Sequence, residues 1–247
     1  MLLVGTREFA QSVRKCGQLF NGTQYWRNDF FQSSDGDVCA PQCYLVEQFP
    51  DSVNPTHFHV QNQFQLFTRG EGTIGRNPKP LRAYVIHYAG AYTGYGPIVA
   101  GPEGVDYITM RAFRDPGAKF VPQQRELLRP GPKRHWASEP LAPMPSEALA
   151  ALTATDWIAV HGPDPDGLAV DQIRVPAHSH VDIKTAPAAV AMFVVVIQGA
   201  ARHAGRALGH LENVFVSSED APYRLETGDQ PAEVLVLHMP AHDPAYA

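Results

Sequence analysis

The chain has 247 residues, of which 44% are apolar and 18% are charged, and it carries a net charge of −5. This composition is typical of a folded globular protein, and it excludes a disordered chain, a collagen and a membrane-spanning bundle. The acidic excess argues against a nucleic-acid groove or an anionic membrane surface as the main partner.

Short extended runs dominate the chain, and 20 glycines and 22 prolines separate them. Helical patterns are confined to residues 6–16 and 146–152, and in the second stretch Pro145 and Ser146 can start a helix. The predicted strands are, in order, 63–68, 81–88, 107–113, 193–198, 213–216 and 233–238. Short strands at this spacing predict an all-β sandwich or barrel.

A proline-rich segment near the midpoint of the chain, residues 129–150, predicts a stiff linker. It would separate an N-terminal domain, 1–128, from a C-terminal domain, 151–247. The start of the chain lacks the features of a signal peptide. The three cysteines (Cys16, Cys39 and Cys43) fit free thiols in a reducing compartment, so we expect a cytoplasmic protein.

The two halves share a faint repeat. Three features recur at offsets of 129, 128 and 127 residues: an apolar run ending in glycine (66–70 and 195–199), a turn ending in tyrosine (91–95 and 219–223), and a closing strand (106–111 and 233–238). Three matches at nearly constant offset indicate an internal duplication.

The stretch that carries chemical information contains His57, His59 and Gln63, followed by Gly70. Residues two apart on a strand point to one face, so the two imidazoles aim together. Gln63 follows a predicted turn and can return on the next strand as a third donor, while Gly70 permits a tight turn. Such a donor set suits a divalent transition metal. A metal-free polar pocket and ordinary surface histidines are the alternatives.

The same residues resemble the first motif of the cupin superfamily, G-x5-H-x-H-x3,4-E-x6-G, with Gln63 where glutamate is usual. The resemblance covers residues 54–113 and, by pattern only, 161–240; the two-part organisation resembles the quercetinase-like bicupin dioxygenases. It implies an all-β fold of two double-stranded β-helix (jelly-roll) barrels with few short helices. It also implies one divalent metal (Fe, Mn, Ni, Cu or Zn) held by the motif histidines, the Gln and a later His.

That later histidine is where the sequence departs from the family. The second cupin motif, G-x5-P-x-G-x2-H-x3-N, aligns Tyr95 with the ligand position, and His87 lies eight residues earlier. Either His87 completes the set with His57, His59 and Gln63, or Tyr95 takes that place, or neither does. Because the amide of Gln63 is a poor proton acceptor, a mechanism that needs a glutamate base there is disfavoured.

A substrate pocket is expected beside the metal, with Tyr92, Tyr95 and Arg111 on its wall. Arginine can bind a carboxylate and aromatic rings can form a wall, although packing and an exposed strand face are the alternatives. In the second half, the residues at the ligand positions are Ala186, Ala188 and Met192. We therefore expect the second barrel to have lost its ligands, with the His178-Ser179-His180 stretch in a loop.

The resemblance makes a metal-dependent enzyme acting on a small oxygenated compound the leading expectation, as a dioxygenase-type oxidoreductase. A metal-dependent isomerase or decarboxylase is the close rival, and a non-catalytic bicupin that binds a small ligand is the alternative from another class. Fold alone does not decide the reaction. We expect a small-molecule substrate and neither nucleic acid nor membrane as partner, and the resemblance implies a homodimer.

Overall fold

The computed structural model describes residues 1–32, 37 and 39–246, and within them strands predominate and every strand pairing is antiparallel. This confirms the all-β prediction. Two compact units are present: Phe9–Leu141 with the residues from His242 onward, and Met1–Glu8 with Ala142–Ala241. They are called the N-terminal and C-terminal barrels below. No helix in the described residues is long and apolar enough to cross a membrane.

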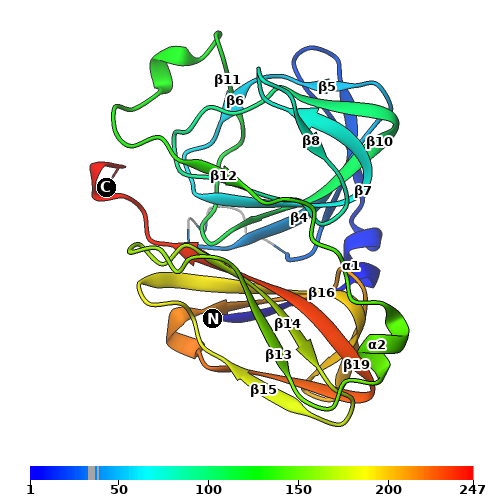
Figure 1. Ribbon diagram of the computed structural model, residues 1–247. Helices are drawn as coiled ribbons and strands as arrows, with labels where there is room; N and C mark the ends of the chain where they lie inside the picture. Colours follow the sequence, from blue (N-terminus) through cyan, green and yellow to red (C-terminus); the bar gives the residue numbers. More distant parts are fainter. Residues whose placement is uncertain (33–36, 38, 247) are drawn as a thin grey trace. The chain divides into compact units, whose positions relative to one another are not determined.

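The N-terminal barrel is built on one large sheet with strand order β12-β9-β7-β10-β4-β3-β2 (Figure 1). Strand β5 pairs with β10, β8 pairs with β7, and β11 pairs with β6. The strands are β2 (Lys15–Gln18), β3 (Gln24–Asp29), β4 (Gln42–Gln48), β5 (Val53–Asn54), β6 (His57–Phe58), β7 (Gln63–Ile74), β8 (Lys79–Leu81), β9 (Ile86–Ala89), β10 (Ile98–Arg111), β11 (Lys119–Phe120) and β12 (His135–Ala137). Helix α1 (Arg7–Ser12) precedes them and the 3-10 turn η1 (Arg125–Leu127) follows β11.

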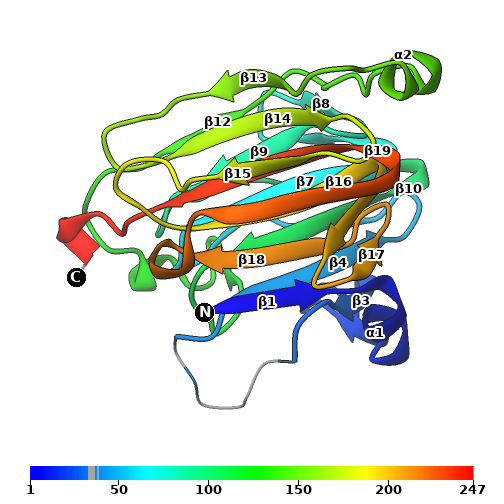
Figure 2. The ribbon, with the colours of Figure 1, turned by 90° about the horizontal axis from the view of Figure 1, so that it is seen from below.

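The C-terminal barrel has strand order β1-β18-β16-β19-β14-β13, with β15 on β19 and β17 on β16. Its first strand comes from the start of the chain, because β1 pairs with β18 over the whole strand (Figure 2). The elements are β1 (Leu2–Gly5), α2 (Ser146–Ala150), β13 (Asp156–His161), β14 (Ala169–Val175), β15 (His180–Ile183), β16 (Ala189–His203), β17 (Arg206–Leu208), β18 (Asn213–Ser217), η2 (Ser218–Asp220) and β19 (Tyr223–Pro240), and η3 (Pro244–Tyr246) lies beyond this unit.

Most predicted elements are found, with shifted ends. The helices expected over 6–16 and 146–152 are the shorter α1 and α2, and the proline-rich segment 129–150 contributes β12 and α2. The strand predicted over 81–88 is wrong as one element, because β8 ends at Leu81 and β9 begins at Ile86. Between them the chain turns at Tyr84, which has a φ of 62° and so cannot continue a strand.

The interiors of the two barrels differ in polarity. The inward positions at the start of β7 are Gln63, Gln65 and Phe67, whereas the repeat offset of 129 places Met192, Val194 and Val196 there in β16. The latter three belong to an apolar cluster that fills the C-terminal barrel. The N-terminal barrel has its apolar cluster around Phe67 and Tyr107 and leaves polar side chains above it. A ligand site is therefore to be sought in the N-terminal barrel.

Gly70 and Gly199 are equivalent turn points in β7 and β16. Each has a positive φ (70° and 71°). A Cβ on Gly70 would lie 2.1 Å from the carbonyl oxygen of Gly104, and one on Gly199 would lie 1.9 Å from that of Pro231, both far inside van der Waals contact. This shared geometry agrees with the repeat in the sequence.

A Gly70→Ala variant should unfold more easily. The methyl group would lie 2.1 Å from the Gly104 carbonyl oxygen in a left-handed backbone, so we expect a loss of roughly 2–4 kcal/mol in unfolding free energy. Urea denaturation measures it. Gly94→Ala, with no atom within 4 Å of the added methyl group, is the matched control. Equal stability of the two variants would contradict the close contact between position 70 and the Gly104 carbonyl.

Candidate functional site

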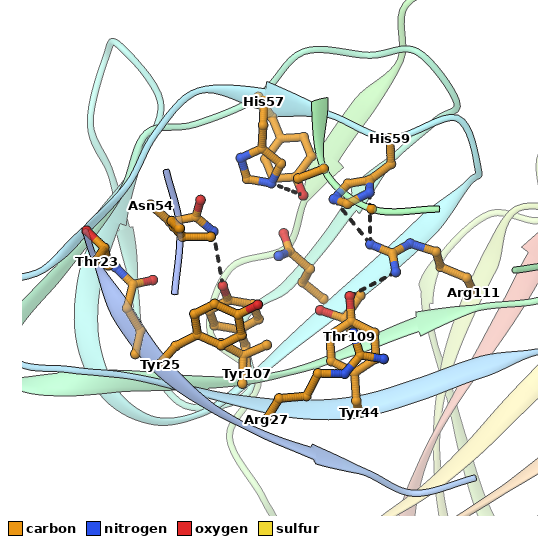
Figure 3. Close-up of a pocket in the computed structure, with 17 residues that line it drawn as sticks. Thr23, Tyr25, Arg27, Tyr44, Asn54, His57, His59, Tyr107, Thr109 and Arg111 are labelled. Atoms are coloured by element: carbon orange, nitrogen blue, oxygen red, sulfur yellow. Dashed lines mark hydrogen bonds between the residues drawn. The ribbon is translucent and has the colours of Figure 1, made fainter. Parts of the chain in front are cut away.

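Of the seven side chains singled out from the sequence, the structure gathers five inside the N-terminal barrel: His57, His59, Gln63, Tyr95 and Arg111. Figure 3 shows His57, His59 and Arg111 around the pocket. His57 lies on β6, and its backbone forms a two-way bridge with Tyr95 in the loop before β10. Gln63 opens β7 and Arg111 ends β10, on the face where Gln65 pairs with Thr109. The large sheet therefore supplies Gln63 and Arg111, whereas His57 comes from β6 of the small β6–β11 sheet and is bridged to the loop that carries Tyr95.

His57 is held from behind by the backbone. Its Nδ1 lies 2.6 Å from the carbonyl oxygen of Pro55, so Nδ1 carries the hydrogen and donates it. Its Nε2 then accepts from the hydroxyl of Tyr95 at 2.8 Å. Burial, aided by the neighbouring His59, lowers the pKa of His57 to about 3. The imidazole is neutral near pH 7 and presents an Nε2 lone pair to the interior.

His59 is held in the same tautomer by a carboxylate. Its Nδ1 donates to Oδ1 of Asp115 at 2.7 Å, and Asp115 also accepts from the backbone N–H groups of Val60 and Gly117. Burial and the charge of Arg111 lower the pKa of His59 to about 4. Although burial opposes it, the hydrogen bonds from His59 and the backbone hold the pKa of Asp115 below its ordinary value. The pair is thus a carboxylate bonded to a neutral imidazole, not two charged groups.

The carbonyl oxygen of Gln63 is occupied by Arg111. Oε1 accepts from Nη2 and Nε of Arg111 at 2.6 and 3.1 Å, while the amide N–H donates to the Tyr95 hydroxyl. A guanidinium can only donate, so Arg111 fixes this orientation of the amide.

Within the part of the chain that the structure describes, the hydrogen-bond partners of the Arg111 cation are all neutral groups. Arg111 is 2% exposed, and Nη1 donates to Oε1 of Gln42 at 3.2 Å and to the hydroxyl of Tyr44 at 2.9 Å. Nη2 lies 3.2 Å from both ring nitrogens of His59. Burial acts to lower the pKa of Arg111, but the surrounding tyrosines and Asp115 raise it further, so the guanidinium stays charged.

These residues surround a cavity with a volume of about 130 Å³. No aspartate or glutamate is among the described residues that line it: Leu19, Thr23, Tyr25, Arg27, Tyr44, Val46, Gln48, Asn54, His57, His59, Gln65, Tyr95, Tyr107, Thr109, Arg111, Gly117 and Ala118. The cavity is thus rich in hydroxyl and amide groups and carries positive charge.

His87 and Tyr92 do not join this group. His87 is buried, bonds through Nδ1 to Oε1 of Gln65 at 2.9 Å, and lines a separate cavity of about 670 Å³. The ring of Tyr95 lies next to both histidines, with centroids 4.5 Å from His57 and 5.0 Å from His87. Tyr92, expected in the pocket, instead packs against Phe58 in a different apolar cluster, because its backbone turns there with a φ of 56°.

Asp115 is the functional residue that sequence reasoning missed. It lies four residues after the end of β10, in an Asp-Pro-Gly turn of the kind found in many loops. No spacing rule connects residues 59 and 115. Only the fold of the chain after β10 places this carboxylate on His59.

In the C-terminal barrel, the second His-x-His stretch is exposed, with His178 in a turn and His180 at the start of β15. His178 therefore lies outside the strands, as expected, but His180 opens β15, so the expectation of a loop holds for only part of the stretch. The apolar cluster occupies the equivalent interior.

The donors of this site fit a divalent metal in part. Ligating histidines commonly donate their other ring N–H to a carbonyl or carboxylate, as His57 and His59 both do. Their Nε2 atoms and the Tyr95 oxygen fit such an ion, whereas Gln63 does not while its carbonyl faces Arg111. No group of three His, Cys, Asp or Glu side chains in the described residues is arranged to hold a metal, because this set contains only two.

Metal-free protein should lose stability as the pH falls from about 6.5 to 4. Unfolded imidazoles take up a proton near pH 6.5, but the pKa values of His57, His59 and His87 in the fold are about 3 to 4. The unfolded state then binds more protons, at a cost of up to about 1 kcal/mol per pH unit for each imidazole. Urea denaturation at several pH values measures the slope, which His87→Gln should reduce. A flat profile would contradict these values.

No protein-family profile and no curated protein matches the chain, but solved structures do. A candidate dioxygenase from Nostoc punctiforme matches with a TM-score of 0.61 and 12% identity, over 100% of this chain and 82% of that one. A mutant oxalate decarboxylase from Bacillus subtilis matches with a TM-score of 0.60 and 10% identity, over 98% of this chain and 77% of that one. A bacterial pirin from Escherichia coli, in complex with nickel(II), matches with a TM-score of 0.58 and 11% identity, over 97% of this chain and 99% of that one.

Proposed function

The chain has the cupin fold, and on that premise we propose that the N-terminal barrel binds one divalent transition metal and acts as a dioxygenase-type oxidoreductase on a small oxygenated compound. The observation that carries the proposal is the shared tautomer of His57 and His59. Each is tied at Nδ1 and offers Nε2 to the same cavity, which is the arrangement that metal-binding histidines adopt.

In this proposal His57 and His59 are the metal ligands, with the Tyr95 oxygen as a third donor in place of the family's later histidine. Pro55 and Asp115 orient the two imidazoles. Gln63 and Arg111 position Tyr95 and the substrate. A bound iron, manganese, nickel, copper or zinc ion would supply Lewis acidity or oxygen-binding capacity.

Oxidation is favoured over proton abstraction by the lining of the cavity. Among its described residues no carboxylate is available as a general base, and the two imidazoles have strongly lowered pKa values. The likeness to a candidate dioxygenase supports the same choice, whereas the likeness to an oxalate decarboxylase supports the rival reaction class.

A second candidate function is metal-free binding of a small ligand. It is favoured by Arg111, which occupies the carbonyl of Gln63 and lies against the ring of His59. A cation in this position disfavours a second positive charge nearby.

Elemental analysis of untagged protein, followed by oxygen-uptake assays with phenols, diketones and small hydroxycarboxylates, tests the proposal. We expect about one transition-metal ion per chain and oxygen consumption with at least one compound class. Protein that holds no metal after incubation with each of the five ions would favour the metal-free binder. A metal-loaded protein that releases carbon dioxide without consuming oxygen would favour a decarboxylase.

A further inference from the structure

Among the described residues no acidic side chain is in direct contact with Arg111, and Asp115 acts on it only from behind His59. The five N–H groups of Arg111 face Gln63, Gln42, Tyr44 and His59, all neutral. Arg27, the other arginine of the cavity, donates to Oδ1 of Asp29 at 2.6 and 2.8 Å. A buried cation without a paired anion is costly, so the cavity beside Arg111 favours a negatively charged group.

Two donors at this end are available to such a group. Nη2 of Arg111 lies at equal distance from both nitrogens of His59, and one of these already carries a hydrogen for Asp115, so this N–H is poorly matched to the ring. The hydroxyl of Tyr44 accepts from Arg111 and keeps its own hydrogen to donate. A carboxylate can accept from both.

Buried acceptor oxygens to which no described residue donates lie at the other end of the cavity, beginning with Gln48 on β4. Gln48 is 3% exposed and lines the cavity, and its amide N–H groups donate to the carbonyl oxygens of Ser52 and Ile98. Because both partners are acceptors, the amide orientation is fixed and Oε1 is left with no hydrogen-bond partner in the described structure. Oδ1 of Asn54, another lining residue, is likewise buried and unpartnered there. These oxygens require a donor.

The donors of Arg111 and Tyr44 and the acceptor oxygens of Gln48 and Asn54 lie at different places in the same cavity. Tyr44 and Gln48 are four residues apart on the same face of β4, about 14 Å along the strand. In Figure 3, Arg111 and Asn54 lie on opposite sides of the drawn group. Cavities near 150 Å³ hold a benzene-sized molecule, so the 130 Å³ here limits the ligand to a small one.

We infer that the ligand of this cavity is a small aliphatic hydroxycarboxylate, with its carboxylate on Arg111 and Tyr44 and its hydroxyl on the carbonyl oxygens of Gln48 and Asn54. This inference rests on the proposed function only in treating the ligand as the substrate. Binding itself requires no metal, so the two can be tested separately.

Isothermal titration calorimetry on metal-stripped and metal-loaded protein tests the inference. The probes are ω-hydroxycarboxylates of three to six carbons, the carboxylates of equal length without the hydroxyl, and the matching diols. We expect one hydroxycarboxylate to bind at least about tenfold more tightly than both of its analogues, with or without metal. Equal affinities within each set, or no binding, would overturn the inference.

Variants test which residues bind the carboxylate and which bind the hydroxyl of the ligand. Arg111→Met should weaken the binding of both carboxylate types at least about tenfold and leave the affinity for the diol unchanged. Gln48→Met should lower the affinity for the hydroxycarboxylate to that for the plain carboxylate. If Arg111→Met does not fold, Tyr44→Phe replaces it, and we expect a severalfold loss of affinity for both carboxylate types. Arg224→Met, at an exposed ion pair in the C-terminal barrel, is the control. Loss of all three ligand types in the Gln48 variant would contradict the assigned orientation.

The outcomes separate the inference from the proposed function. Selective hydroxycarboxylate binding by a protein that takes up no metal would retain the inference and reject the enzyme. Stoichiometric metal with no preference among the three ligand types would do the reverse.

Discussion

The His57→Ala/His59→Ala double variant is expected to lose its metal, from about one ion per chain to background. Two of the three proposed ligands disappear, and the oxygen of Tyr95 alone cannot hold a divalent ion against water. Asp115 would keep its two backbone donors, so the loop after β10 should remain folded. Elemental analysis of both proteins after identical loading and dialysis measures the loss.

The chain contains its own matched control for this experiment. His178→Ala/His180→Ala removes a histidine pair of identical spacing that is exposed in the C-terminal barrel. We expect its metal content to equal that of the unaltered protein. Equal metal in all three proteins, or a loss only in the His178/His180 variant, would reject the site in the N-terminal barrel.

The part of the site that the sequence predicts is the part that local periodicity controls. His57 and His59 share one face because of strand geometry, and the turn that follows returns Gln63 beside them. Between the two candidates for the later donor the sequence favours His87 over Tyr95, but that choice depends on how the loop before β10 bridges back to His57. The backbone bridge favours Tyr95 in the place next to the histidines, and Gln65 holds His87 elsewhere.

Contacts distant in sequence were beyond prediction for a physical reason. Arg111 appears in the sequence as one residue of an alternating strand, equally suited to solvent. Its burial depends on Gln42 and Tyr44, which reach it across the pairing of β4 with β10. The orientation of the Gln63 amide, and thus its poor fit as a ligand, follows from that same pairing and not from the motif.

The fold was predicted best where strands are long and apolar, as in β16 and β19. It was predicted least well at single residues that redirect the backbone. The strand expected over 81–88 breaks at Tyr84, a residue type that rarely takes a positive φ. The pairing of β1 with β18 joins residues more than 200 positions apart, and no local pattern in the first five residues indicates it.

Glu233→Ala is expected to destabilise the C-terminal barrel by about 3–5 kcal/mol, the largest stability change among these predictions. Glu233 is fully buried on β19 and accepts from Arg174 and Gln172 at 2.7 Å and from the backbone N–H of Met144 at 2.8 Å. Truncation would leave these donors without their acceptor in a dry interior, and Asp156 would then be the remaining partner of Arg174.

Urea denaturation monitored by circular dichroism measures this loss, and two comparisons define its cause. Glu233→Gln keeps one acceptor oxygen and should lose less than the alanine variant, although its amide NH2 then faces one of the donors that the second carboxylate oxygen accepted from. Asp182→Ala removes the acidic partner of Arg224 in an exposed ion pair and should leave the transition unchanged. If Glu233→Ala and Asp182→Ala unfold at the same urea concentration, the buried network does not stabilise the barrel. In that case other interactions, among them the apolar packing around β16 and β19, maintain the barrel.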